Sequence, residues 1–265
     1  MENESSLGHL HPSVLLGVAA LAVIYLIGIR ITHAKLSRRC ALCFAAALAM
    51  ILLALNGPVD GLADDRLFTA HMLQHLMLSL VMPPLLLLGI PEELLRPILP
   101  HRWIRPIARG LTNPLVAFAL YNGVLVWIHN PPIFEWMCRD EDFHVAVHIL
   151  LMITGTVMWW PLLSPLPELP RLSYPAQMLY LFFLLIPMAA VSAPITLSSE
   201  VIYPWYLEGP HPLGVEPLAD QVAGGLLMWV GAGCYIILVF TLIFAVWCRH
   251  EDRDTPMVGI HLQPR

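Results

Sequence analysis

The sequence predicts an all-α membrane protein, a polytopic bundle of seven transmembrane helices. Hydrophobic residues make up 58% of the 265 residues and charged residues 12%, which is about half of the charged fraction of a soluble domain. Mean hydropathy is correspondingly high, at +0.70. The charge of the connecting loops also alternates along the chain, and this alternation tests the number of helices independently.

The apolar residues form seven blocks, each close to the ~20 residues that an α-helix needs to cross a bilayer. The blocks cover residues 13–31, 40–56, 67–89, 113–129, 143–163, 175–197 and 221–247. The first block follows Glu2 and Glu4 instead of a basic stretch, and no small-residue cleavage pattern comes after it, so we expect it to remain as a span. Because no long polar insertion separates the blocks, we expect residues 1–265 to form one domain.

The loop charges support seven spans. Basic residues occupy every second loop and the end of the chain, namely Arg30, Lys35, Arg38, Arg39, Arg96, Arg102, Arg105, Arg109, Arg171, Arg249 and Arg253. The alternate loops are rich in acidic residues, and Arg66 and Arg139 are the only basic residues in them. By the positive-inside rule, the N-terminus lies outside and the C-terminus lies in the cytoplasm. The basic loops then reflect sidedness and contact with the lipid bilayer, and we expect no nucleic-acid partner.

Prolines lie inside two of the predicted spans. Pro83 and Pro84 fall in the third, and Pro187 and Pro194 fall in the sixth. A proline inside a helix removes a hydrogen bond, so we expect kinks whose freed carbonyls are satisfied by neighbouring helices. Such kinks serve either as bends that fit the bundle or as a hinge.

Histidines gather at one depth, near the outer end of the predicted bundle. His71 and His75 open the third span, His144 and His148 open the fifth, and His129 ends the fourth. Three spans enter from the same side, so their first residues lie at similar heights. Further polar residues at or beyond this level are Asp220 and Gln221, which open the seventh span, and His9, His11 and His211.

The spacing of these histidines favours a bound metal or haem. Residues four apart share a helix face and lie about 6 Å apart along the axis, so each pair offers two imidazoles to one region. A single membrane histidine is commonly a hydrogen-bonded packing residue, but two such pairs at one depth favour ligands. Met152 and Met228 continue these faces inward. Imidazole with thioether suits copper, whereas imidazole with carboxylate suits zinc or Cu(II).

Several classes of protein are excluded or disfavoured. Lys35 is the only lysine and lies in a loop, so a retinal Schiff base in the last span is excluded. No acidic or basic residue falls in the middle of the third to sixth spans, which argues against a carboxylate proton relay. No hydrolase motif is present, and we expect the protein not to be an enzyme. Cys40 and Cys43 are either small packing residues or a metal hand-over or redox pair.

Four motifs follow one another along the chain. They are His71-Met72-x-x-His75 leading to Pro83-Pro84 and Gly89-Ile90-Pro91, then Trp127-x-His129-x-Pro131, then His144-x-x-x-His148 with Trp159-Trp160-Pro161, and finally Asp220-Gln221-x-x-Gly224-Gly225-x-x-Met228-Trp229. Together they resemble the polytopic CtaG family of cytochrome c oxidase assembly factors, over about residues 60–247. The resemblance is to the multispan family linked to the caa-type oxidase, and not to the single-span copper chaperone that sometimes shares the name.

The resemblance implies a multi-pass protein of the bacterial inner membrane that helps to mature a respiratory haem-copper oxidase by delivering copper. It implies metal ligands at His71, His75, His144 and His148. Further ligands or supporting residues would be His129, Asp220 and Met228, with Gln221 and Met152 beside them, and Asp220 would fix the tautomer of a ligating imidazole. The expected partners are an oxidase subunit and a periplasmic copper chaperone.

Two other functions stay open at this point. A b-type cytochrome would use one histidine from the third span and one from the fifth as axial ligands of haem. A metal permease would need polar groups that continue to the cytoplasmic side, where the spans are apolar. The metal of an assembly factor could be copper or zinc.

Overall fold

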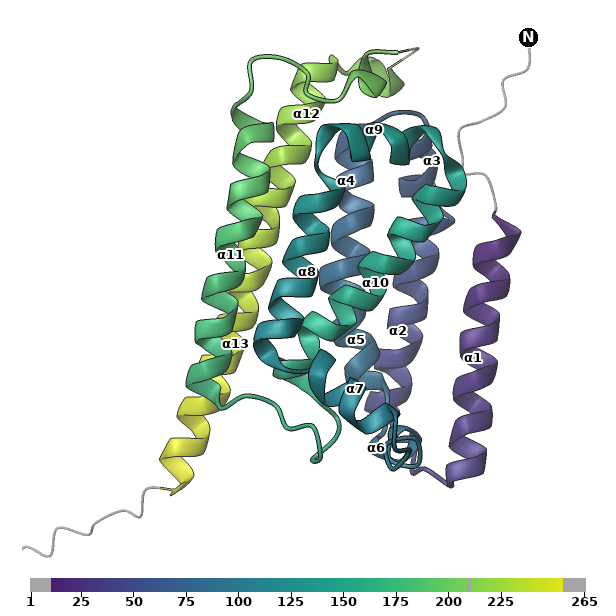
Figure 1. Cartoon of the computed structure of the whole chain (residues 1–265), viewed down its shortest axis with the longest axis vertical. Helices are drawn as coiled ribbons and strands as arrows, with labels where there is room; N and C mark the ends of the chain where they lie inside the picture. The colour runs from purple at the N-terminus through teal and green to yellow at the C-terminus, as the bar shows by residue number, and fades with distance from the viewer. Residues whose placement is uncertain (1–10, 209–210, 255–265) are drawn as a thin grey trace, which may run out of the picture.

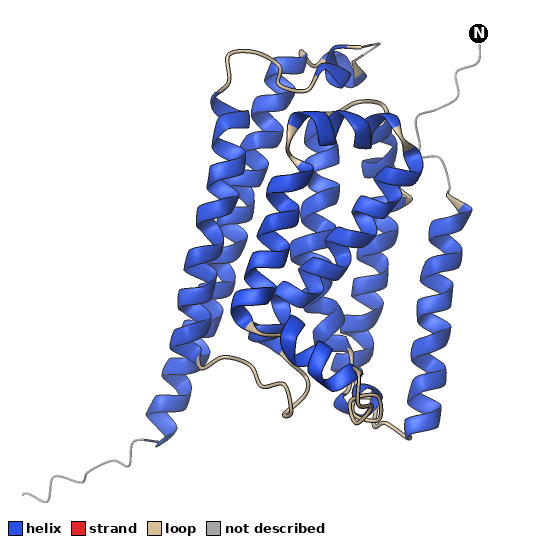
Figure 2. Ribbon diagram, viewed as in Figure 1, coloured by secondary structure: helices blue, strands red, loops and turns tan. Residues whose placement is uncertain are grey.

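The computed structural model describes residues 11–208 and 211–254, and within these ranges the protein is helical, with no β-strand (Figures 1 and 2). The predicted all-α membrane bundle is therefore confirmed. Six helices are long and apolar enough to cross a membrane, and a seventh crossing is made if α7 (Ile104–Leu111) and α8 (Pro114–Ile128), which meet at 70°, count as one.

Each of the seven predicted spans corresponds to a helix or a run of helices. They are α1 (Pro12–Thr32), α2 (Arg38–Leu55), α4 (Phe68–Leu76) continuing through η1 (Met77–Val81) into α5 (Met82–Gly89), α8, α10 (Glu141–Leu163), α11 (Tyr174–Leu197), and α12 (Pro217–Leu226) continuing through η4 (Leu227–Gly231) into α13 (Ala232–Asp254). The fourth, α8, has 15 residues. At 1.5 Å per residue it is about 22 Å long, which is short for a crossing by itself.

Short helices cover the two ends of the bundle. α3 (Pro58–Asp64) and α9 (Pro131–Arg139) lie at the end where α4, α10 and α12 begin (Figure 1). The single turns η2 (Pro204–Leu207) and η3 (Pro212–Gly214) belong to the long connection between α11 and α12. α6 (Glu92–Leu95) and α7 lie at the opposite end, with the other loops predicted to be cytoplasmic. We call the first end the histidine end.

The proline pair of the third span follows a π-helical turn, η1. Pro84 has no N–H to give to the carbonyl of Leu80, and the hydroxyl of Tyr235 donates to that carbonyl instead (3.1 Å). A neighbouring helix thus satisfies a freed carbonyl, as the sequence predicts. The carbonyl of Ser79 lies so close to Gly155 of α10 that a Cβ there would approach it to 2.7 Å.

Glycines bring α12 against two neighbouring helices. A methyl group at Gly224 would overlap the ring of Phe68 on α4, and one at Gly225 would overlap Thr196 on α11. At these two glycines α12 therefore packs closely against both α4 and α11. Beneath the histidine end, the core between α5, α8, α10, α11 and α13 is apolar, with Trp159 and Leu184 among its fully buried side chains.

Asp220 joins α12 to the beginning of α4. Its Oδ2 accepts a hydrogen bond from the backbone N–H of Phe68 (2.6 Å), and its Oδ1 accepts from the backbone N–H and the hydroxyl of Thr69 (3.0 and 2.6 Å). The first N–H groups of a helix have no partner inside the helix. The carboxylate supplies that partner from another helix, and its charge also suits the positive end of the helix dipole.

We predict that Asp220→Asn lowers the stability of the protein by about 2 kcal/mol, because an amide N–H₂ then faces a backbone N–H. The thermal unfolding midpoint in detergent should fall by several degrees. Glu216→Gln removes the same charge from an exposed cap of α12 and is the matched control. Equal midpoints for the two variants would contradict the interhelical role of Asp220.

Candidate metal centre

Four imidazoles from two helices converge at the histidine end. His71 and His75 lie one turn apart on α4, and His144 and His148 lie one turn apart on α10. One ring nitrogen from each lies within 4.8 Å of those of the other three. His71, His75 and His148 are buried and His144 is half-buried. The structure therefore brings together the four residues predicted as metal ligands.

The nitrogen spacing matches that of a metal site. His71 Nε2 lies 3.0 Å from His75 Nε2 and 3.2 Å from His144 Nε2. A tetrahedral ion with imidazole nitrogens at ~2.0 Å holds those nitrogens ~3.3 Å apart. Two ring nitrogens at such a distance must share a proton or a cation, since lone pairs repel each other. One N–H on His71 can serve only one of its two neighbours.

Tyr206 of η2 supports His71 from outside the cluster. Its hydroxyl lies 2.8 Å from His71 Nδ1 and shares a hydrogen bond with the Cys138 thiol. When His71 Nδ1–H donates to Tyr206, the Nε2 lone pair faces the other imidazoles, which is the tautomer that binds a metal. Burial raises the pKa of the Cys138 thiol to about 12, so without a bound cation the thiol stays protonated at neutral pH.

His129, at the end of α8, lies beside the four imidazoles. Its ring centre is 6.2 Å from that of His75. Its Nδ1–H donates to the carbonyl of Leu125 (2.8 Å), while its Nε2 is buried and receives no hydrogen bond from the described residues. His129 therefore presents an unpaired nitrogen next to the cluster, although it lies outside the set of four.

Asp220 and Gln221 do not reach the imidazoles, contrary to the role expected for them. Asp220 is engaged at the beginning of α4 and supports His71 and His75 only by fixing the helix that carries them. Gln221 accepts from the N–H of Ile202 (2.6 Å) and donates to the carbonyl of Ile195 (3.2 Å), so it ties the α11–η2 connection to α12. Tyr206, rather than Asp220, contacts one of the four imidazoles.

The two methionines have different surroundings. Met228 is buried in an apolar cluster with Phe68, Met72 and Phe134. Met152 lies one turn beyond His148 on α10 and shares a cavity with His144 and His148. Of the two methionines predicted as ligands, Met152 is therefore the one that lines the same cavity as the α10 histidines.

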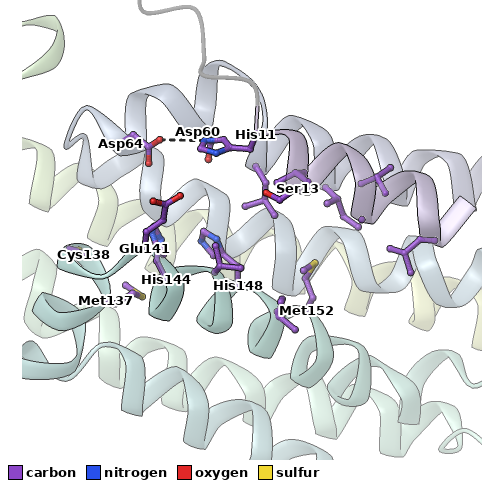
Figure 3. A pocket seen from close by; sticks show the side chains of 18 of the residues that line it. His11, Ser13, Asp60, Asp64, Met137, Cys138, Glu141, His144, His148 and Met152 are labelled. Carbon is purple, nitrogen blue, oxygen red and sulfur yellow. Dashed lines mark ion pairs between the residues drawn. The ribbon is translucent and has the colours of Figure 1, made fainter.

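A cavity of about 670 Å³ opens beside the α10 histidines (Figure 3). Residues of α1, α2, α3, α9 and α10 line it, and His144, His148 and Met152 form one wall. His11, Asp60 and Asp64 form the opposite wall near the histidine end (Figure 3). His11, predicted to lie at the outer end, therefore lines the cavity, whereas His9 lies outside the described residues.

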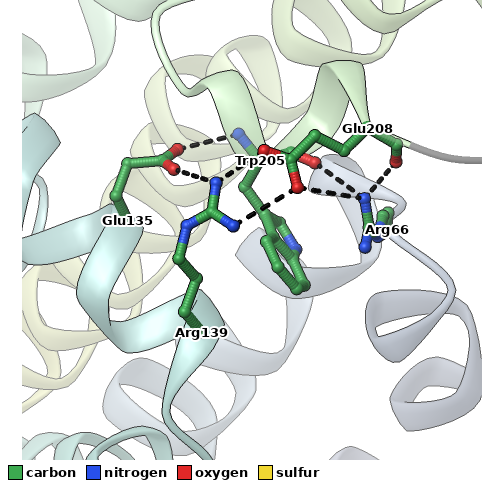
Figure 4. Close-up of polar contacts among 5 residues, drawn as sticks. All are labelled: Arg66, Glu135, Arg139, Trp205 and Glu208. Atoms are coloured by element: carbon green, nitrogen blue, oxygen red, sulfur yellow. Dashed lines mark hydrogen bonds and ion pairs between the residues drawn. The ribbon is translucent and has the colours of Figure 1, made fainter.

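Residues 198–208, which we call the covering segment, close the other side of the cluster. Tyr203 and Tyr206 of this segment pack against Phe134 of α9, which in turn contacts the His71 ring. Two arginines hold the segment (Figure 4): Arg139 donates to Glu208 (2.7 Å), and Arg66 stacks on Trp205 with its Cζ 4.1 Å from the ring centre. Arg66 also donates to the backbone carbonyl of Glu208.

Comparison with known sequences gives few but consistent relatives. Uncharacterized proteins of Mycobacterium bovis, Mycobacterium tuberculosis and Mycobacterium leprae are each 26% identical to the chain over 206 residues. These matches cover 71% of this chain and 31% of each relative, so the chain spans about a third of the length of those proteins. No solved structure shows a significant match.

The match to a protein family is more extensive. The sequence profile described as cytochrome c oxidase caa3 assembly factor (Caa3_CtaG) matches residues 23–250. This range covers the second half of α1 and the other six predicted spans, and it includes the four histidines of the cluster. The chain therefore belongs to the CtaG family of cytochrome c oxidase caa3 assembly factors.

Proposed function

We propose that this protein holds a copper ion between His71, His75, His144 and His148 and delivers it to the copper centre of a haem-copper oxidase. The observation that carries the proposal is the convergence of three Nε2 atoms at 3.0 and 3.2 Å. Membership of an oxidase assembly family supports the destination. The bacterial cytoplasmic membrane is the proposed location, with the histidine end facing outward according to the loop charges.

Copper is the proposed cargo for chemical reasons. Imidazole binds both copper and zinc, and the thioether of Met152 in the adjoining cavity favours copper. Copper binds such nitrogen sites more tightly than the other divalent first-row metals. The ion is carried and not used, so the proposal includes no catalytic step by the protein itself.

The packing of the rings argues against the haem alternative. A haem with two axial histidines needs one imidazole on each face of a wide, planar macrocycle. Here the ring centres of His71 and His144 are 4.8 Å apart, and those of His71 and His75 are 4.5 Å apart. The rings contact one another directly, which suits a single ion. The apolar core below them likewise gives no support to a permease.

The cavity supplies the proposed route for the ion. His144 and His148 line it, whereas His71 is covered by Tyr206 and Phe134. A delivery protein must release its metal, so one side of the site has to be reachable by the donor and by the receiving oxidase subunit. We propose that a periplasmic copper donor and the oxidase subunit both reach the imidazoles from this cavity.

We predict that His71→Ala and His144→Ala each reduce the copper bound by several nitrogens in the purified, copper-loaded protein by about tenfold or more, because each removes a converging nitrogen. Electron paramagnetic resonance of the multi-nitrogen copper signal after gel filtration measures this, with elemental analysis for the total copper. His101→Ala, which removes an exposed histidine from the opposite end, is the matched control. Unchanged copper in both site variants, or a Soret band that shifts on reduction, would overturn the proposal.

We predict that Tyr206→Phe weakens copper binding about 10- to 100-fold while the protein stays folded, because His71 Nδ1 loses its partner but the aromatic packing remains. Competition with a copper chelator measures the affinity. Tyr203→Phe makes the same chemical change on a hydroxyl that donates to the carbonyl of His129, and should leave the affinity near wild type. Equal affinities for the two variants would show that Tyr206 does not support the site.

A third prediction concerns the covering segment. The hydrogen bond from Arg139 lowers the pKa of Glu208 below its ordinary value. The ion pair is therefore present at neutral pH and is lost only as the pH falls through the lowered pKa of Glu208. Both partners are exposed, so high salt should also weaken the pair.

We accordingly predict faster amide hydrogen exchange in residues 200–208 for Glu208→Gln at pH 7, and for the wild type after a shift to a pH below the lowered pKa of Glu208. Rates are compared after correction for intrinsic exchange. Glu200→Gln changes an exposed glutamate of the same segment and serves as control. Wild-type exchange in Glu208→Gln at pH 7 would mean that the pair does not hold the segment closed.

A further inference from the structure

A second group of metal-capable side chains lies across the cavity from the four imidazoles. His11 directly precedes α1, and Asp60 and Asp64 lie one turn apart on α3. His11 Nε2 is 3.2 Å from Asp60 Oδ2 and 3.9 Å from Asp64 Oδ2. One donor atom from each residue lies within 4.8 Å of the other two, which is close enough for one ion to contact all three.

Neighbouring residues hold this group in place. The backbone N–H of His11 donates to the side-chain oxygen of Asn56 (2.8 Å), which fixes the beginning of α1 against the end of α2. Asp60 Oδ1 accepts from Gln74 Nε2 (2.8 Å). Asp60 Oδ2 is buried and makes no hydrogen bond of good geometry with the described residues, and the nitrogen that faces it is His11 Nε2 at 3.2 Å. A buried carboxylate oxygen is costly unless a hydrogen bond or a cation satisfies it, and an ion bound by both His11 and Asp60 would do so.

The donor set defines the class of ion. One imidazole and two carboxylates form a mixed nitrogen and oxygen site, which suits Cu²⁺ or Zn²⁺ better than the softer Cu⁺. With a neutral imidazole, the two carboxylates carry two negative charges, which a divalent ion neutralises.

The position of the group indicates how it would act. Exposure decreases inward, from the Asp64 side chain at 47% through His11 at 34% to Asp60 at 10%. All three line the cavity that His144 and His148 line from the other side (Figure 3). Gln74, which bonds to Asp60, precedes His75 on α4. The group thus connects solvent to the space beside the imidazoles.

We propose that His11, Asp60 and Asp64 form a second site for a divalent transition-metal ion, at which the ion is taken up before it reaches the four imidazoles. The route rests on the proposed function of the imidazole site, whereas the second site itself does not. No change in oxidation state is part of the proposal, and the ion moves through the cavity as the divalent cation.

Cu²⁺ binding to the 265-residue protein in detergent tests the site. The His71→Ala/His144→Ala double variant should still bind one Cu²⁺, with electron paramagnetic resonance showing coupling to one nitrogen. Adding Asp64→Asn should weaken this binding about tenfold or more. Adding Asp65→Asn, which neutralises the exposed neighbouring carboxylate, should not. Asp60→Asn provides a second test, because the asparagine oxygen can still accept from Gln74.

The outcomes separate the two proposals. A double variant that binds no Cu²⁺, or equal affinities with Asp64→Asn and Asp65→Asn, overturns the second site. A third outcome is that the wild-type protein binds only one ion. If His11→Ala loses this ion and the double variant keeps it, the second site is supported and the imidazole site is overturned. For the route, Asp64→Asn should slow the appearance of the multi-nitrogen copper signal about tenfold relative to Asp65→Asn. Equal loading rates contradict the uptake role.

Discussion

Every imidazole that enters an apolar bundle brings two ring nitrogens that need partners, and this need organises the histidine end. Two of the Nδ1 atoms are paired, that of His71 with Tyr206 and that of His129 with the carbonyl of Leu125. The Nε2 atoms of His71, His75 and His144 face one another instead, and His148 Nε2 receives no hydrogen bond from the described residues. An unpaired buried polar atom costs about 1–3 kcal/mol. One ion bound between the Nε2 atoms satisfies several of them together.

The rest of the bundle holds the two histidine helices at matching heights. Asp220 fixes the beginning of α4, one turn before His71. Ser79 lies about two turns beyond His71, and its carbonyl rests against Gly155 of α10. Gly155 in turn lies two turns beyond His148. The two helices run in the same direction, so this contact brings His148 level with the α4 pair. A larger residue at 155 would separate the helices, and the imidazoles with them.

Sequence reasoning could find the parts of the site that depend on helix period and depth. The i, i+4 spacing predicts that His71 and His75 share a face, and the span count places His144 and His148 at the same height. Depth does not define the direction around a helix axis, so Asp220 was expected near the imidazoles but faces the beginning of α4. Tyr206 comes from a loop 135 residues away from His71, and no local period connects the two. The partnership of His11 with Asp60 likewise depends on tertiary packing.

The two donor sets on the walls of one cavity differ in a way that suits transfer. Carboxylates at a partly exposed rim exchange their ligands with water, and they attract divalent cations from a distance through their charge. Buried imidazoles bind copper more strongly because nitrogen donors are softer and water is excluded. Under the proposed function, the free energy of the ion therefore falls as it moves inward from Asp64 toward His148. Delivery onward would require the receiving protein to offer a still better set of ligands from the same cavity, so we propose that a partner acts at the half-open wall at His144.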